Sequence, residues 1–216
     1  MSTPEAKRAH AQIIQTAARE VLASLGLQQK GRSRTWLDDR QWFVIVVEFQ
    51  PSGFSLGSYL NVGCHWLWQQ EAHLSYDLSG RPERFIRNRN EEQFRSAMKA
   101  LGEHAAHNVK VYRTKFQTID DLAKYYKKHP PVKGWPTFHA AIATGLSGNQ
   151  TASQALFEAF LVDDDMREFA IAARKDARHL YGLIKSPEQF SSVIIERIKQ
   201  KRELLKLPGL VTVPFC

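Results

Sequence analysis

The chain has 216 residues, of which 43% are hydrophobic and 24% charged, and its formal net charge is +8. A chain of this length can bury a hydrophobic core without disulfides, and its two cysteines, Cys64 and Cys216, are placed for neither a disulfide framework nor a metal site. No apolar stretch approaches the roughly 18 residues of a membrane span, so we expect a cytoplasmic protein without a signal peptide.

The positive charge favours an anionic partner such as nucleic acid or a phosphorylated ligand. The excess is spread thinly, however, because none of the stretches 1–30, 31–68, 69–117 and 118–216 carries more than +3. A dedicated polyanion track is therefore not indicated.

Helical spacing of apolar residues predicts an N-terminal helix from Pro4 to Leu25, stopped by Gly26. Short runs of β-branched and aromatic residues, separated by turn formers, then predict an antiparallel meander. Its strands are expected at about 28–37, 41–50, 58–68 and 71–78, with a fifth at about 83–89.

Asn90 and Gln93 have the spacing of a helix cap and predict a helix that runs to about residue 107. From Thr118 onward the pattern is helical in several pieces. We therefore predict an α+β fold with a sheet domain at 1–117 and a helical domain or extension at 118–216. The stretch 127–134 reads as a linker or sharp joint.

Strand alternation predicts one apolar face and one mixed face for the sheet. Burial should select the register that places Phe43, Ile45, Val47 and Phe49 beside Leu60, Val62, Cys64 and Trp66. The strand at 71–78 would add Ala72, Leu74, Tyr76 and Leu78 to this apolar face.

The opposite, mixed face then collects acids, amides and imidazoles among apolar side chains. Its polar members are Glu48, Gln50, Asn61, His65, His73, Ser75 and Asp77. Two interpretations stay open: a solvated or helix-covered side with paired polar groups, or a ligand surface.

Arginines after the meander would complete such a surface, because forked guanidinium groups suit phosphate and carboxylate. Solvated cations at an exposed strand end are the alternative. The predicted ligand-binding residues are Glu48, Gln50, Ser52, Tyr59, Asn61, His65, Arg87 and Arg89.

Short motifs at residues 46–52 and 58–63 resemble a bacterial family called domain of unknown function 4304. Leu25-Gly26-Leu27, Lys30-Gly31-Arg32, Gln50 with Ser52, and Asn61 with Gly63 match its pattern in order. The resemblance covers roughly residues 10–90 and implies the α+β layout, but it supplies no activity.

Glu48-Phe49-Gln50, with Asp38 and Asp39 upstream, superficially matches the metal-binding core of restriction-type nucleases. If the two aspartates form the hairpin tip, they lie about 30 Å from Glu48, at about 3.3 Å per residue, which is too far for one metal to bridge. The residue opposite Glu48 would then be near Lys30, and a cross-strand ion pair would result.

We therefore expect a non-enzymatic binding module, without metal or cofactor. It would recognise an anionic ligand, nucleic acid or a protein partner through the mixed face, and the helical half would cover one side or dock a protein. The alternative is a metal-dependent hydrolase or nuclease that uses Glu48 with His65, His73 or Asp77, since a histidine and a carboxylate can act as general acid and base.

Overall fold

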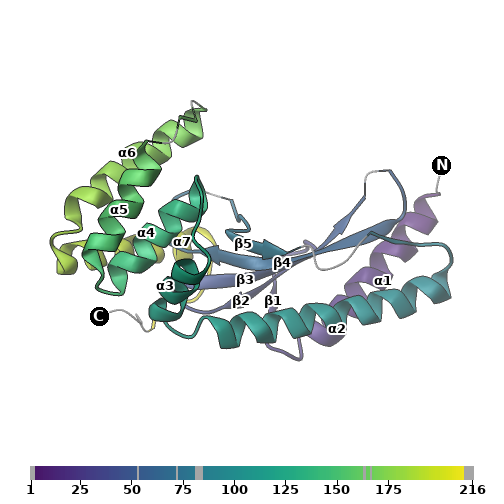
Figure 1. The fold of residues 1–216 in the computed structure, drawn as a ribbon. Coiled ribbons are helices and arrows are strands. Elements are labelled where there is room, and N and C mark those ends of the chain that lie inside the picture. The colour runs from purple at the N-terminus through teal and green to yellow at the C-terminus, as the bar shows by residue number, and fades with distance from the viewer. Residues whose placement is uncertain are drawn as a thin grey trace. The chain divides into compact units, whose positions relative to one another are not determined.

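The computed structural model describes residues 3–52, 54–71, 73–80, 85–162, 164–165 and 167–211 (Figure 1). It confirms the predicted α+β class: an N-terminal helix, an antiparallel sheet and then a series of helices. The chain forms two compact units. Unit 1 comprises Met1–His65 and Leu74–Thr114, and unit 2 comprises Trp66–His73 and Lys115–Cys216.

Unit 1 is a sheet with helices on one face. Its elements are α1 (Pro4–Leu22), β1 (Gln28–Gln29), β2 (Thr35–Asp39), β3 (Phe43–Pro51), β4 (Gly57–Trp66), β5 (Leu78–Gly80), β6 (Ile86–Arg87) and α2 (Glu91–Lys115). The strand order is β1-β2-β3-β4-β5, and β6 pairs with β4 beside it. The last residues of β4 and α2, Trp66 and Lys115, belong to unit 2.

Local signals fix the ends of the two long helices. The hydroxyl of Thr3 accepts a hydrogen bond from the Ala6 amide, and Pro4 occupies the first turn of α1. At α2 the predicted cap is present, since the Asn90 side chain accepts from the Gln93 amide at 2.9 Å. This helix runs to Lys115, beyond the predicted end near 107, because its buried side continues as far as Val109.

The predicted strand at 28–37 is wrong, because a turn divides it. Gly31 adopts a positive φ of 57°, and the Ser33 side chain donates to the Lys30 carbonyl, so the chain reverses between β1 and β2. The predicted break at Asp38 and Asp39 is also wrong. Both belong to β2, and the hairpin turns after them, where Gln41 has a positive φ of 70°.

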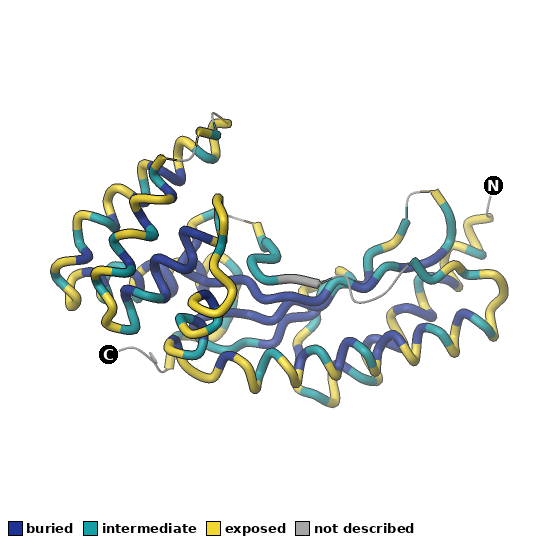
Figure 2. Tube along the Cα trace, in the orientation of Figure 1, coloured by how far each residue is buried: buried dark blue, intermediate teal, exposed yellow. Residues whose placement is uncertain are grey.

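The apolar face of the sheet is covered by α1 and α2, which lie along the same side (Figure 1). Phe43, Ile45, Val47 and Phe49 are all completely buried, and the trace of the central strands is dark blue in Figure 2. Asp38 pairs with Ile45 in the β2–β3 ladder and is bound by Arg113 of α2, so this face points to the helices. Each such buried side chain stabilises the fold by about 1.5–3 kcal/mol.

The predicted strand at 71–78 is also wrong. Only Leu78–Gly80 pairs with β4, and Glu71 and His73 belong to unit 2 instead. There Lys201 donates its ammonium hydrogens to the carbonyls of both residues, the second at 3.1 Å. These bonds tie Glu71 and His73 to unit 2 rather than to the β4 ladder. Of the strand expected at 83–89, Ile86 and Arg87 form β6, and residues 81–84 lie outside the described part of the chain.

Unit 2 is helical. Its helices are α3 (Ile119–Lys128), α4 (Trp135–Leu146), α5 (Gln150–Leu161), α6 (Glu168–Leu183) and α7 (Pro187–Leu204). Thr118 and Asp121 form a reciprocal capping box at α3, and Asn149 caps α5. The stretch 127–134, read from the sequence as a joint, connects α3 to α4 inside this unit.

The segment Trp66–His73 belongs to the core of unit 2. Leu67 and Trp68 are completely buried, and the indole N–H of Trp68 donates to Nδ1 of His139 in α4 at 3.1 Å. Gln69 contacts Nε2 of the same imidazole at 2.9 Å. Since Nδ1 accepts, Nε2 carries the proton, and Gln69 must present its carbonyl oxygen to it.

Candidate functional site

Three of the predicted polar residues gather on the mixed face of the unit 1 sheet. The Asn61 amide donates to Glu48 Oε2 and to Gln50 Oε1, each at 3.0 Å. The hydroxyl of Tyr76 donates to the same Glu48 oxygen at 3.1 Å. The sequence placed Tyr76 on the apolar face, which is wrong, because residues 74–77 are not a strand and their side chains do not alternate against β4.

Glu48 is half-buried, and its hydrogen-bond partners are the neutral donors Asn61 and Tyr76. Its partner in the β2–β3 ladder is Thr35, so the cation expected near Lys30 does not stand opposite it. Among the described residues no lysine or arginine forms an ion pair with this carboxylate. Within the described part of the chain the network therefore carries a negative charge without a cationic partner, which suits a cation or a hydrogen-bond donor better than an anion.

His65, Ser75 and Asp77 also come together, but not as a nucleophilic triad. Nδ1 of His65 lies 2.8 Å from Ser75 Oγ and 3.3 Å from Asp77 Oδ2, and the serine hydroxyl donates to Asp77 at 2.7 Å. In a triad the imidazole bridges the serine and the acid through its two different nitrogens. Here one nitrogen faces both, and His65 is completely buried, so the cluster fixes the chain that leads into β5.

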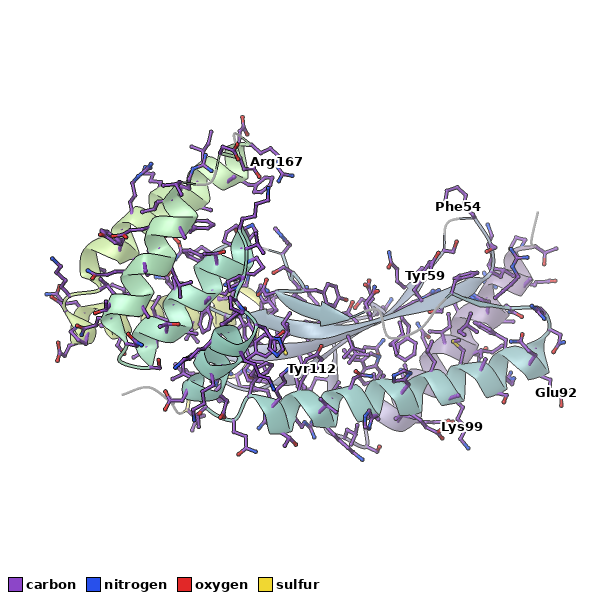
Figure 3. The ribbon with its side chains drawn as sticks, in the orientation of Figure 1. Phe54, Tyr59, Glu92, Lys99, Tyr112 and Arg167 are labelled. Carbon is purple, nitrogen blue, oxygen red and sulfur yellow. The ribbon has the colours of Figure 1, made fainter. Side chains whose placement is uncertain are left out.

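The other predicted site residues are dispersed. The Ser52 hydroxyl accepts the Phe54 amide in the β3–β4 loop, from which the fully exposed Phe54 projects (Figure 3). Arg87 and Arg89 are exposed, and Arg87 stands opposite Gly57. His73 is exposed and belongs to unit 2.

Tyr59 lies on β4 beside Phe85, with ring centroids 4.9 Å apart, and is labelled in Figure 3. A Cβ at the neighbouring Gly57 would lie 2.3 Å from the Phe85 ring and from the Ile86 carbonyl oxygen, so only glycine fits at that position. The Tyr59 ring and β6 are thereby held against the same end of β4.

The described residues do not assemble into the ligand set that the alternative metal-dependent site requires. Among the described residues no three histidines, cysteines or acids lie close enough to hold one ion. Asp38 projects to the helix-covered face, where Arg113 binds both of its oxygens, whereas Glu48 projects to the opposite face. The two carboxylates of the nuclease comparison therefore lie on different sides of the sheet.

Sequence reasoning missed an apolar groove in unit 2, with a volume of about 600 Å³. Small-molecule sites in proteins typically enclose roughly 300–1,000 Å³ and are lined mainly by apolar side chains. Its walls are α3 and α5, and α4 forms its floor. The lining residues are Asp120, Ala123, Lys124, Tyr126, Lys127, Pro130, Pro131, Ala140, Thr144, Ser147, Asn149, Ala152, Ala155 and Leu156.

The groove exists because small residues recur where the helices face it. On α4, Ala140 and Thr144 are one helical turn apart, and on α5, Ala152 and Ala155 are three residues apart. Larger side chains there would fill the space. α4 itself is buried nearly all round, as its dark blue trace in Figure 2 shows, so it forms a fixed floor.

Charge at the groove comes from α3. Lys124 and Lys127 are three residues apart on its groove side and are exposed, and Asp120 precedes them by one turn. The spacing of these residues, together with the small side chains of α4 and α5, is the only sequence signal that could have located the groove.

No protein-family model, curated protein or solved structure matches this chain. Along the described residues, no helix combines the length and the apolar character that crossing a lipid bilayer demands.

Proposed function

We propose that the chain is a non-enzymatic binding module whose ligand site is the groove formed by α3, α4 and α5. The observation that carries this proposal is an apolar groove of about 600 Å³ with two lysines at one wall. Alanine, proline and leucine side chains supply contact area, and the lysines supply orientation.

The ligand that fits best is a small amphiphile with an apolar chain and an anionic head, such as a medium-chain carboxylate. The head group would pair with Lys124 and Lys127, whose ammonium groups are strongly hydrated point charges. A nucleic-acid track would need a longer array of cations than these two lysines, one of them a turn from Asp120.

The test is a titration of the full chain with decanoate, followed by amide NMR shifts. From the number of heavy atoms in decanoate we expect a Kd on the order of 1 mM and shifts centred on α3 and α5. Ala152→Trp should abolish these shifts by filling the groove, while Gln189→Trp, at an exposed position of α7 outside the groove, should leave them unchanged.

Charge reversal tests the contribution of the anionic head group of decanoate separately from that of its apolar tail. Lys124→Glu with Lys127→Glu should weaken decanoate binding about tenfold, whereas Lys128→Glu, outside the groove, should not. Equal binding by the wild type, the double variant and Lys128→Glu, or shifts located elsewhere in the chain, would show that the groove is not the site.

A second candidate is the mixed sheet face, favoured by the uncompensated carboxylate of Glu48. Its partner would carry a cation or several hydrogen-bond donors, as a basic protein segment does. Titration with a lysine-rich peptide should shift the Asn61 side-chain amide, and Glu48→Gln should remove the effect. A hydrolase built on Glu48 with His65, His73 or Asp77 is less well supported, because Nδ1 of His65 serves both Ser75 and Asp77.

We further propose a cytoplasmic location, which the buried free thiol of Cys64 supports, since reducing compartments preserve thiols. Membership of the bacterial family of unknown function, suggested by residues 10–90, likewise remains a proposal.

A further inference from the structure

Unit 2 contains a second cavity, which the segment Trp66–His73 forms together with α4 and α6. Its volume is about 300 Å³, at the lower end of the range of roughly 300–1,000 Å³ that is typical of small-molecule sites. None of the residues that line the groove lines this cavity, so the two sites can be tested independently. The cavity is lined by Glu71 of the segment, by Trp135 and Phe138 of α4, and by Ala172, Ala173 and Asp176 of α6.

Glu71 is held at the cavity by its main chain rather than by its side chain. Lys201 of α7 donates to the Glu71 carbonyl oxygen, and Gln69, two residues earlier, contacts Nε2 of His139 at 2.9 Å. The side chain is partly buried, and its Oε2 is a buried atom without a hydrogen-bond partner among the described residues. The other oxygen, Oε1, is therefore the one that a ligand in the cavity can reach.

The cations near the cavity are engaged by other groups. Arg197 binds both oxygens of Asp176 through its two terminal nitrogens, so this acid already has its counter-charge. The ammonium group of Lys201 is directed to the carbonyl oxygens of Glu71 and His73. Among the described residues no lysine, arginine or histidine forms an ion pair with the Glu71 carboxylate.

The start of α4 has few amide hydrogens to offer this carboxylate. Pro136 has no N–H, and the amides of Thr137 and Phe138 bond the Gly134 carbonyl at 2.9 and 3.3 Å. A carboxylate that is partly removed from water and lacks such partners is unfavourable on its own. A positively charged ligand with N–H donors would supply both the counter-charge and the hydrogen bond that Glu71 lacks.

Trp135 and Phe138 form an aromatic wall of the cavity. Their ring centroids are 5.5 Å apart, and the ring planes meet at 85°. The Trp135 ring also stacks on His139, with centroids 5.9 Å apart, so neighbouring rings hold the indole in place. The face of a tryptophan ring attracts a cation that lies within about 6 Å of its centroid. An unpaired carboxylate and a tryptophan on one small cavity therefore favour an organic cation.

We propose that this cavity binds a small primary ammonium ion that carries a short apolar or aromatic substituent. The ammonium group donates to Oε1 of Glu71 and lies against the Trp135 ring, and the substituent contacts Phe138, Ala172 and Ala173. A primary ammonium offers three N–H donors to the carboxylate, whereas a quaternary ammonium offers none. The two sites of unit 2 thus select ligands of opposite charge.

The test is a titration of the full chain with benzylammonium at constant ionic strength, followed by the indole N–H resonances of the tryptophans in NMR spectra. Trp135→Phe identifies the Trp135 resonance. From the number of heavy atoms in benzylammonium we expect a Kd on the order of 1 mM and the largest indole shift at Trp135. Benzyl alcohol, which has a similar shape but no charge, should bind at least about tenfold more weakly.

Variants separate the charge of the site from its shape. Glu71→Gln keeps the shape of the side chain and removes its charge, so it should weaken benzylammonium binding at least about tenfold. Glu188→Gln, at an exposed acid of α7 outside the cavity, should bind like the wild type. Ala172→Phe should abolish the Trp135 shift by filling the cavity from an exposed helix position.

Absence of a Trp135 shift in the wild-type protein would overturn the site, and this measurement does not depend on how well any variant folds. Equal affinity of the wild type and Glu71→Gln, or of benzylammonium and benzyl alcohol, would show that the carboxylate does not recognise the ligand. Benzyltrimethylammonium, which has no N–H donor, should bind at least about tenfold more weakly than benzylammonium. Equal affinity for these two cations would exclude recognition of a primary ammonium group.

Discussion

The ion pair between Asp38 and Arg113 should be among the most consequential polar contacts of unit 1. Arg113 donates from Nε to Asp38 Oδ2 at 2.9 Å and from Nη2 to Oδ1 at 2.7 Å, and Nη2 also bonds the Leu25 carbonyl at 2.8 Å. The hydrogen bond to Asp38 is the main cause that raises the pKa of Arg113. The pair thus joins β2, α2 and the end of the N-terminal helical segment.

Removing one partner of a buried pair typically costs about 3–5 kcal/mol, because the other charge stays buried. The Asp38 side chain is 7% exposed, but that of Arg113 is 28% exposed and can regain some water. We therefore expect Asp38→Ala to lower the free energy of unfolding by about 2–3 kcal/mol. Asp38→Asn keeps one acceptor and should cost about 1–2 kcal/mol.

Urea unfolding followed by tryptophan fluorescence measures these losses, and a double-mutant cycle with Arg113→Met isolates the coupling between the two side chains. We expect a coupling energy above about 1 kcal/mol. Strictly additive effects, or a loss below about 0.5 kcal/mol for Asp38→Ala, would refute the reasoning that this pair is buried and bidentate.

Three further predictions concern other described residues. His139→Phe removes the acceptor of the buried Trp68 indole and should lower the free energy of unfolding by about 1–3 kcal/mol, measured by urea unfolding. Hydrogen bonding from Arg167 lowers the pKa of Asp165 to about 2 from its usual 3.8, so Arg167→Gln should return it toward that value in a carboxyl NMR titration. The pKa of His10 is lowered below 6.5 in the folded chain, so its stabilising contribution is complete above pH 6.5 and falls as the pH drops below it. In chloride buffer His10→Phe should flatten this pH dependence of the free energy of unfolding. A profile identical to that of the wild type would contradict the assignment of the pH dependence to His10.

Local signals in the sequence correctly identified the starts of two helices. Asn90 with Gln93 and Thr118 with Asp121 cap helices through bonds that span three residues, so their spacing alone identifies them. The alternation in β3 and β4 also located the shared side of Glu48, Gln50 and Asn61. The pleat of a strand fixes which side chains share a face.

Distant contacts account for what the sequence could not reveal. Asp38 looks like a turn residue, yet it lies within a strand because Arg113, 75 residues away, satisfies its charge. Residues 71–78 have the alternation of a strand, but Lys201 donates hydrogen bonds to the carbonyl oxygens of Glu71 and His73, and these bonds hold the two residues in unit 2. Local propensity predicts neither pairing.

The candidate groove illustrates the same limit at the level of the site. Its lysines and alanines were visible in the sequence, but no single helix reveals the groove, because it depends on three helices meeting at a particular spacing. On the mixed face, by contrast, the alternation of β3 and β4 correctly grouped Glu48, Gln50 and Asn61, although it failed for the segment 71–78. The acidic character of this face emerged only when β2 placed Thr35, rather than a cation, opposite Glu48.

The return of Trp66–His73 to the helices makes the polypeptide cross between its two units three times. No single cut can then liberate both parts intact: a fragment ending at Thr114 would carry the Trp68 indole without its imidazole, and the remainder would have an unfilled core. The bond from Lys201 to Glu71 joins residues that are 130 positions apart in the sequence. The helical unit can therefore complete its core only after the segment 66–73 has packed against it. Expression of the two halves as separate fragments should yield insoluble protein. Experiments on either unit should therefore use the whole chain.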